Sequence, residues 1–258
     1  MQIKILIIML LQTLIMPFII GAIGARFYKK SSALFIILIA WVIAFFWING
    51  QVLLYPKTPV EQLWVFLSVA VLITYFVKDK FYKTAMSLLY IVGLLIASWP
   101  VVQYELTFVF TLESGLFLAA GLFVIFVKSK NNRAAFTLSM ACVLLGGVSA
   151  LTSSLLMGQV IISLAAASGI YALLEIKHKF KVRQVPEKYL TVFSLMFFML
   201  LYVVRVYVEL NIEVTLSIML AYIVSVFSFK NQSLVIAIII YLLSLVIIVM
   251  DDSGSSYY

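Results

Sequence analysis

The chain has 258 residues, of which 65% are hydrophobic and 11% charged, and it carries a net charge of +8. Ordinary soluble domains are about half apolar and about a quarter charged, so this composition excludes a sizeable aqueous domain. It predicts an all-α polytopic transmembrane bundle, a single integral membrane domain over residues 1–258. The bases lie in short clusters between apolar runs, which excludes a nucleic-acid-binding surface.

Ten apolar segments are predicted to be membrane-spanning helices. Their approximate bounds are 3–25, 33–54, 60–77, 84–102, 107–127, 134–154, 157–174, 189–208, 214–229 and 233–250. The first is too long for the apolar core of a signal peptide and no A-x-A site closes it, so we expect a retained span. Only Gly158 and Gln159 separate the sixth from the seventh, which leaves a broken or re-entrant arrangement as the alternative to two crossings. The ninth and tenth are short for a hydrocarbon layer of about 30 Å.

The lysines and arginines alternate along the chain. The odd-numbered connections hold 15 of the 18 bases, and only Lys4, Lys57 and Arg205 lie on the opposite side. Most acids show the reverse preference; those opposite the bases are Glu61, Glu105, Glu113, Glu209, Glu213, Asp251 and Asp252. By the positive-inside rule, this pattern predicts that both termini are non-cytoplasmic.

Glu113 lies within an apolar run. If its helix begins near residue 107, a rise of 1.5 Å per residue places Glu113 about 9 Å below the membrane boundary. Glutamate is too short to reach water from that depth, so it must be protonated, face a wet cavity or pair with a cation. Arg205 is predicted at a comparable level, and we hypothesise that the two form an intramembrane pair. Two alternatives are a local pair between Arg205 and Glu209, one turn on, and an interfacial Glu113 in a helix that starts later.

Two amides complete the candidate intramembrane polar site. Asn49 and Gln51 lie at the end of the second predicted span. Their side chains are suited to bonding one helix to another or to lining an entrance. The candidate site therefore comprises Glu113, Arg205, Glu209, Asn49 and Gln51.

A basic loop follows the seventh predicted span. Its alternating bases would lie on one side of an extended segment; they are Lys177, Lys179, Lys181 and Arg183. Such a row is a candidate contact for anionic lipid headgroups or an acidic cytoplasmic protein. An ordinary positive-inside loop is the alternative interpretation.

Small residues recur at a spacing of four in the middle of the chain. The pairs are Gly115 with Ala119, Gly146 with Ala150, and Ser154 with Gly158. Because small residues let helices approach closely, this pattern predicts that the fifth to seventh spans form the tightly packed centre. A substrate path along the same faces is the alternative.

No residue pattern typical of an enzyme is present. The chain has one cysteine, Cys142, and one histidine, His178, and it lacks the motifs of phosphate-binding loops and zinc proteases. We therefore expect no catalytic, cofactor-binding or metal site. The sequence favours a non-catalytic scaffold or anchor subunit of an assembly in a bacterial cytoplasmic membrane, with the bilayer and other membrane or acidic cytoplasmic proteins as partners. The alternative is a small ten-span secondary transporter or channel-like protein with a site near Glu113 and Arg205.

Overall fold

The structure is a computed structural model that describes residues 7–26, 33–50, 58–104, 107–127, 134–152, 154–176 and 187–227. Within these ranges all regular structure is helical, as the composition predicts. In chain order the helices are η1 (Leu11–Ile15, a π-helical turn), α2 (Met16–Arg26), α3 (Ala33–Asn49), α4 (Pro59–Phe76), α5 (Asp79–Tyr104), α6 (Phe108–Phe126), α7 (Ala134–Thr152), α8 (Leu155–Ile176), α9 (Glu187–Tyr207) and α10 (Ile212–Phe227).

Seven of the described helical segments are long and apolar enough to cross a membrane. The first of them, Ile7–Gly24, runs through η1 and α2, while α3 and α10 are apolar but shorter. The predicted segments from 3–25 to 214–229 coincide with this series, and the segment 233–250 lies outside the described residues. The segments predicted at 134–154 and 157–174 are two separate helices, α7 and α8, joined at Ser154.

Several helices begin at side chains that satisfy the free N–H groups of the first turn. Thr58 and Glu61 form a capping box at the start of α4, where Pro59 occupies the first helical position. The Thr107 hydroxyl accepts a hydrogen bond from the Phe110 N–H at the start of α6. The sequence thereby determines where α4 and α6 begin, and so how far along each helix axis the following residues lie.

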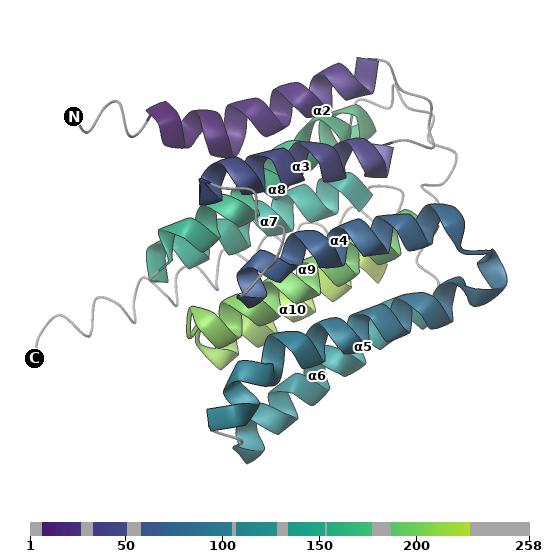
Figure 1. The fold of residues 1–258 in the computed structure, drawn as a ribbon, viewed down its shortest axis with the longest axis vertical. Coiled ribbons are helices and arrows are strands. Elements are labelled where there is room, and N and C mark those ends of the chain that lie inside the picture. The colour runs from purple at the N-terminus through teal and green to yellow at the C-terminus, as the bar shows by residue number, and fades with distance from the viewer. Residues whose placement is uncertain are drawn as a thin grey trace, which may run out of the picture.

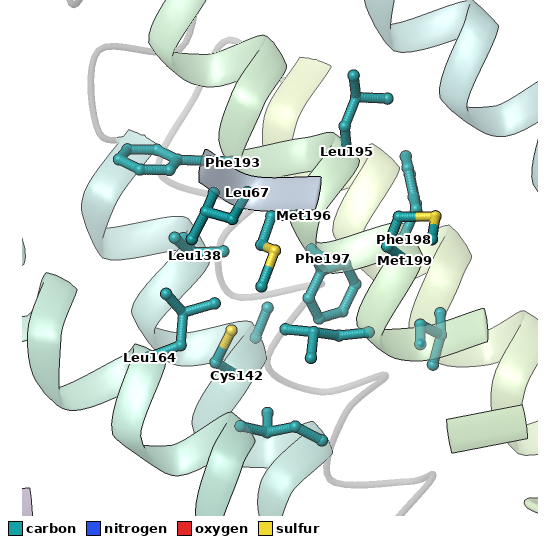
Figure 2. Close-up of a cluster of buried hydrophobic side chains, with 14 of the residues drawn as sticks. Leu67, Leu138, Cys142, Leu164, Phe193, Leu195, Met196, Phe197, Phe198 and Met199 are labelled. Atoms are coloured by element: carbon teal, nitrogen blue, oxygen red, sulfur yellow. The ribbon is translucent and has the colours of Figure 1, made fainter. Parts of the chain in front are cut away.

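Helix α9 occupies the centre of the bundle (Figure 1). It contacts α4, α5, α6, α7 and α10, and every residue from Tyr189 to Val204 is buried. Figure 2 shows α9 side chains gathered with Leu67 of α4, Cys142 of α7 and Leu164 of α8 in one buried cluster. The Phe197 ring stacks on that of Tyr222 in α10, with ring centroids 4.2 Å apart. A helix that is apolar on every side is stable only when it is surrounded, which accounts for the central place of α9.

The prediction that the fifth to seventh spans form the tightly packed centre is therefore wrong for the fifth span, α6, whereas α7 and α8 do pack closely. Only six of the 19 residues of α6 are buried, and a Cβ added at Gly115 would meet no atom within 4 Å. Gly115 and Ala119 are both exposed, so this pair of small residues lies on an outer face. Small residues indicate where two helices approach each other closely, whereas bulky apolar residues fill the centre of the bundle.

The small residues of α7 and α8 do bring those two helices together. A Cβ on Gly158 would lie 2.8 Å from the Gly146 carbonyl oxygen and 2.8 Å from the Ala150 Cβ. The Ser139 hydroxyl donates to the Ala165 carbonyl at 3.0 Å across the same pair of helices. The two helices thus form a closely packed hairpin.

Candidate functional site

Glu113 and Arg205 form a two-pronged ion pair between α6 and α9. Arg205 Nε donates to Glu113 Oε2 at 3.0 Å, and Arg205 Nη2 donates to Glu113 Oε1 at 2.8 Å. The side chain of Glu113 is 8% exposed and that of Arg205 is 24% exposed. Glu113 lies six residues beyond the cap residue Thr107, about 9 Å along α6. The structure thus brings together the two residues that the pairing hypothesis joins.

The third guanidinium nitrogen of Arg205 stabilises the turn between α9 and α10. Its Nη1 donates to the Leu210 carbonyl at 2.9 Å. Glu209 is exposed, has a φ of 57° and is not among the partners of Arg205 that the structure describes. Because α9 ends at Tyr207, Glu209 lies beyond the helix and lacks the geometry of a pair one turn apart. The local pairing with Glu209 disagrees with the structure, and so does a later start of the helix that holds Glu113, since α6 begins at Phe108.

Hydroxyl-bearing side chains lie within three residues of Glu113 or Arg205 in the sequence, among them Ser114, Tyr202 and Tyr207. The hydroxyls of Ser114 in α6 and Tyr202 in α9 lie 2.9 Å apart. The Tyr207 hydroxyl donates to the Ala97 carbonyl of α5 at 2.9 Å. These contacts join α5, α6 and α9 at one end of the bundle, so the ion pair belongs to a polar cluster shared by three helices.

Three members of this cluster, Ser114, Tyr202 and Tyr207, were not predicted from the sequence. A usable signal exists, because Tyr202 lies three residues before Arg205 and therefore projects from the same side of α9. Ser114 follows Glu113 directly, and its hydroxyl is a polar group in an apolar run. Helical periodicity around the charged residue would have identified Tyr202.

Of the two amides, the structure describes Asn49, and its described hydrogen bond does not join it to the ion pair. The Asn49 Nδ2 donates to the Phe45 carbonyl of its own helix at 2.7 Å. Gln51 lies outside the described residues, as do Lys177, Lys179, Lys181 and Arg183. The described part of the candidate site therefore reduces to Glu113 and Arg205.

A second ion pair lies near the opposite end of α9. Lys188 pairs with Asp79 at the start of α5, and its ammonium lies 4.9 Å from the centre of the Tyr82 ring. The Tyr82 hydroxyl donates to the Lys188 carbonyl at 3.0 Å. Asp79 is 91% exposed, so this pair contributes little stability compared with the buried one.

Most of the described basic and acidic residues lie at opposite ends of the bundle. Successive helices run in opposite directions across the bundle, which brings the start of α5 and the start of α9 to one end and the start of α4 and the end of α9 to the other (Figure 1). The first end holds Lys78, Lys80, Lys83 and Lys188, together with Asp79, and the second holds Glu61, Glu209 and Glu213. The Lys83 ammonium also contacts the Phe126 carbonyl at the end of α6, where a cation is favoured.

The cluster is suited to holding helices together. Both carboxylate oxygens of Glu113 accept hydrogen bonds from Arg205, which neutralises its charge within the bundle. Within the described ranges, no three His, Cys, Asp or Glu residues are grouped to hold a metal ion. Comparison with protein-family models, with curated proteins and with solved structures found no match to this chain.

Proposed function

We propose that the protein is a non-catalytic multi-spanning membrane component, a scaffold or anchor subunit of an assembly in a bacterial cytoplasmic membrane. One observation carries the proposal. The carboxylate placed deepest among the described residues is engaged by a guanidinium from a neighbouring helix, and its side chain is only 8% exposed. A carboxylate that binds a transported ion must instead be reachable from water.

The proposal includes a topology of ten crossings with both termini on the non-cytoplasmic side. The gathering of the described lysines at one end of the bundle, with Glu61, Glu209 and Glu213 at the other, supports this orientation. The basic end, which includes Lys78 and Lys80, faces the cytoplasm in this arrangement. It would meet anionic headgroups or acidic partner proteins there.

A small secondary transporter or channel-like protein is the second candidate. The observation in its favour is the hydroxyl cluster beside the ion pair, because ionisable groups within spans often mark ion pathways. Opening of the Glu113–Arg205 pair would release a carboxylate next to Ser114 and Tyr202. In this candidate function, Glu113 alternates between Arg205 and a transported cation.

Two measurements on the full chain separate the candidates. The scaffold proposal predicts that the same membrane proteins co-purify reproducibly through a mild detergent, as identified by mass spectrometry. It also predicts that proteoliposomes with an imposed Na⁺ or K⁺ gradient show no more cation-coupled proton flux than empty liposomes. A pH-sensitive dye measures this flux. Purification without partners, together with a flux that the folded Glu113→Gln variant loses, would instead establish transport.

A further inference from the structure

A groove of about 360 Å³ runs between α4 and α5. Its walls include Phe66 and Val69 of α4 and Val92 and Ile96 of α5, and Met199 of α9 contributes to its lining. It extends along α4 from Pro59 to Val69, about 15 Å at the rise of an α-helix. The groove is therefore long, narrow and parallel to the helices.

The groove is polar at one end only. Gln62 lies three residues after the first residue of α4, near the acidic end of the bundle, and is half-buried. Among the described residues, its side-chain amide has no hydrogen-bond partner. Every other residue lining the groove is apolar or glycine. An occupant with a polar group at one end and an apolar remainder matches this arrangement.

Gly93 determines the shape of the inner wall. A Cβ at this position would lie 2.9 Å from the Phe66 ring and 3.2 Å from the Met199 Cε. The glycine therefore lets the Phe66 ring lie against the backbone of α5. The neighbouring α5 side chains Val92 and Ile96 are 49% and 45% exposed, so the groove opens sideways from the bundle.

The size of the groove suits a single slender occupant. Volumes of about 300–1,000 Å³ are typical of sites for single small molecules, and the groove volume of about 360 Å³ lies in this range. Because the groove is narrow, apolar along its length and open sideways, an extended apolar chain matches its shape.

We propose that this groove binds one acyl chain of a phospholipid from the leaflet at the acidic end of the bundle. The chain lies along Phe66, Val69 and Val92, and the Gln62 amide N–H donates to the ester carbonyl of the lipid. This inference requires that the bundle is embedded in a bilayer, but it is independent of the scaffold function.

The test uses the full chain in phosphatidylethanolamine–phosphatidylglycerol vesicles that contain a phospholipid with a photoreactive diazirine in one acyl chain. After irradiation, mass spectrometry of peptides measures the labelling of α4 and α5. Val92→Trp fills the groove from its open side and is expected to lower the labelling of the groove residues about tenfold. Leu95→Trp is the matched control, because Leu95 is 62% exposed on the same helix and does not line the groove.

A second comparison tests the polar end. An ether-linked version of the probe lacks the ester carbonyl, so it is expected to label the groove of the unaltered protein less than the ester-linked probe does. Gln62→Leu should abolish that difference. Equal labelling in the Val92→Trp and Leu95→Trp variants, with both folded by circular dichroism, would overturn the proposal. So would a Val92→Trp variant that loses a co-purifying protein while its lipid labelling is unchanged.

Discussion

Arg205 and Glu113 lie 92 residues apart in the sequence, and two parallel hydrogen bonds of 3.0 and 2.8 Å join their side chains. The planar guanidinium matches the two oxygens of a carboxylate, so the pair constrains both the distance and the relative rotation of α6 and α9. Loss of either partner leaves a charge buried without compensation, which costs more than the pair itself contributes.

We expect Glu113→Gln to lower the free energy of unfolding by about 3 kcal/mol, because the guanidinium of Arg205 then stays buried beside a neutral amide. Unfolding by sodium dodecyl sulfate in mixed detergent micelles measures the effect. Glu213→Gln is the matched control, since Glu213 is exposed in the first turn of α10, and it should cost less than about 1 kcal/mol. If Glu113→Arg with Arg205→Glu restores none of the stability that either single reversal removes, the ion pair does not hold α6 against α9.

Glu209 provides an independent test of the same region. It is the one non-glycine residue with a positive φ among the described residues, and side chains are strained in that conformation. Glu209→Gly should leave the stability unchanged or raise it by up to about 1 kcal/mol, whereas Glu209→Val should lower it by about 1 kcal/mol or more. The same detergent titration measures both. A loss in Glu209→Gly as large as that in Glu113→Gln would mean that Arg205 depends on Glu209.

Two glycines of α6 should respond in opposite ways to the same substitution. A Cβ at Gly121 would lie 2.0 Å from the buried ring of Tyr90, whose hydroxyl donates to the Phe117 carbonyl at 2.8 Å. Gly121→Ala should therefore destabilise by about 1–3 kcal/mol. Gly115 has open space around it, so Gly115→Ala should stabilise by about 0.5–1 kcal/mol. Thermal unfolding in detergent measures both, and equal shifts would contradict the packing of α5 against α6.

The α7–α8 hairpin depends on Gly158. Its Cβ position lies 2.8 Å from a backbone oxygen, and the backbone cannot rotate away as a side chain would. Gly158→Ala should cost about 1–3 kcal/mol by separating the two helices, and Gly158→Leu should cost more. Gly147→Ala is the control, since no atom lies within 4 Å of a Cβ at that position. Unfolding monitored by the fluorescence of Trp41, whose indole N–H donates to the Val160 carbonyl of α8 at 3.0 Å, reports on this region.

The elements and the buried ion pair follow from different kinds of sequence information. Helix bounds are predictable because apolar runs end at charges and capping residues such as Thr58 and Thr107. The partner of Glu113 is predictable because a carboxylate deep in an apolar segment has few ways to be stabilised, and Arg205 was the cation expected at its level.

The centre of the bundle was not predictable in the same way. Lipid-facing and core-facing positions are both apolar in a membrane protein, so hydropathy does not distinguish the buried α9 from the exposed face of α6. Phe108 is 82% exposed and Phe198 is fully buried, although both are phenylalanines in apolar helices. The hydroxyl contact between Ser114 and Tyr202 depends on how α6 and α9 are rotated, and packing determines that rotation.

Cysteine labelling in right-side-out membrane vesicles tests the proposed orientation of the bundle most directly. With the buried Cys142 replaced by alanine, single cysteines at Lys78→Cys and Glu213→Cys mark the basic and acidic ends of the bundle. An impermeant maleimide is expected to label Glu213→Cys in intact vesicles and to label Lys78→Cys only after permeabilisation. The reverse pattern, or labelling of both positions from the same side, would contradict a bundle whose basic end faces the cytoplasm.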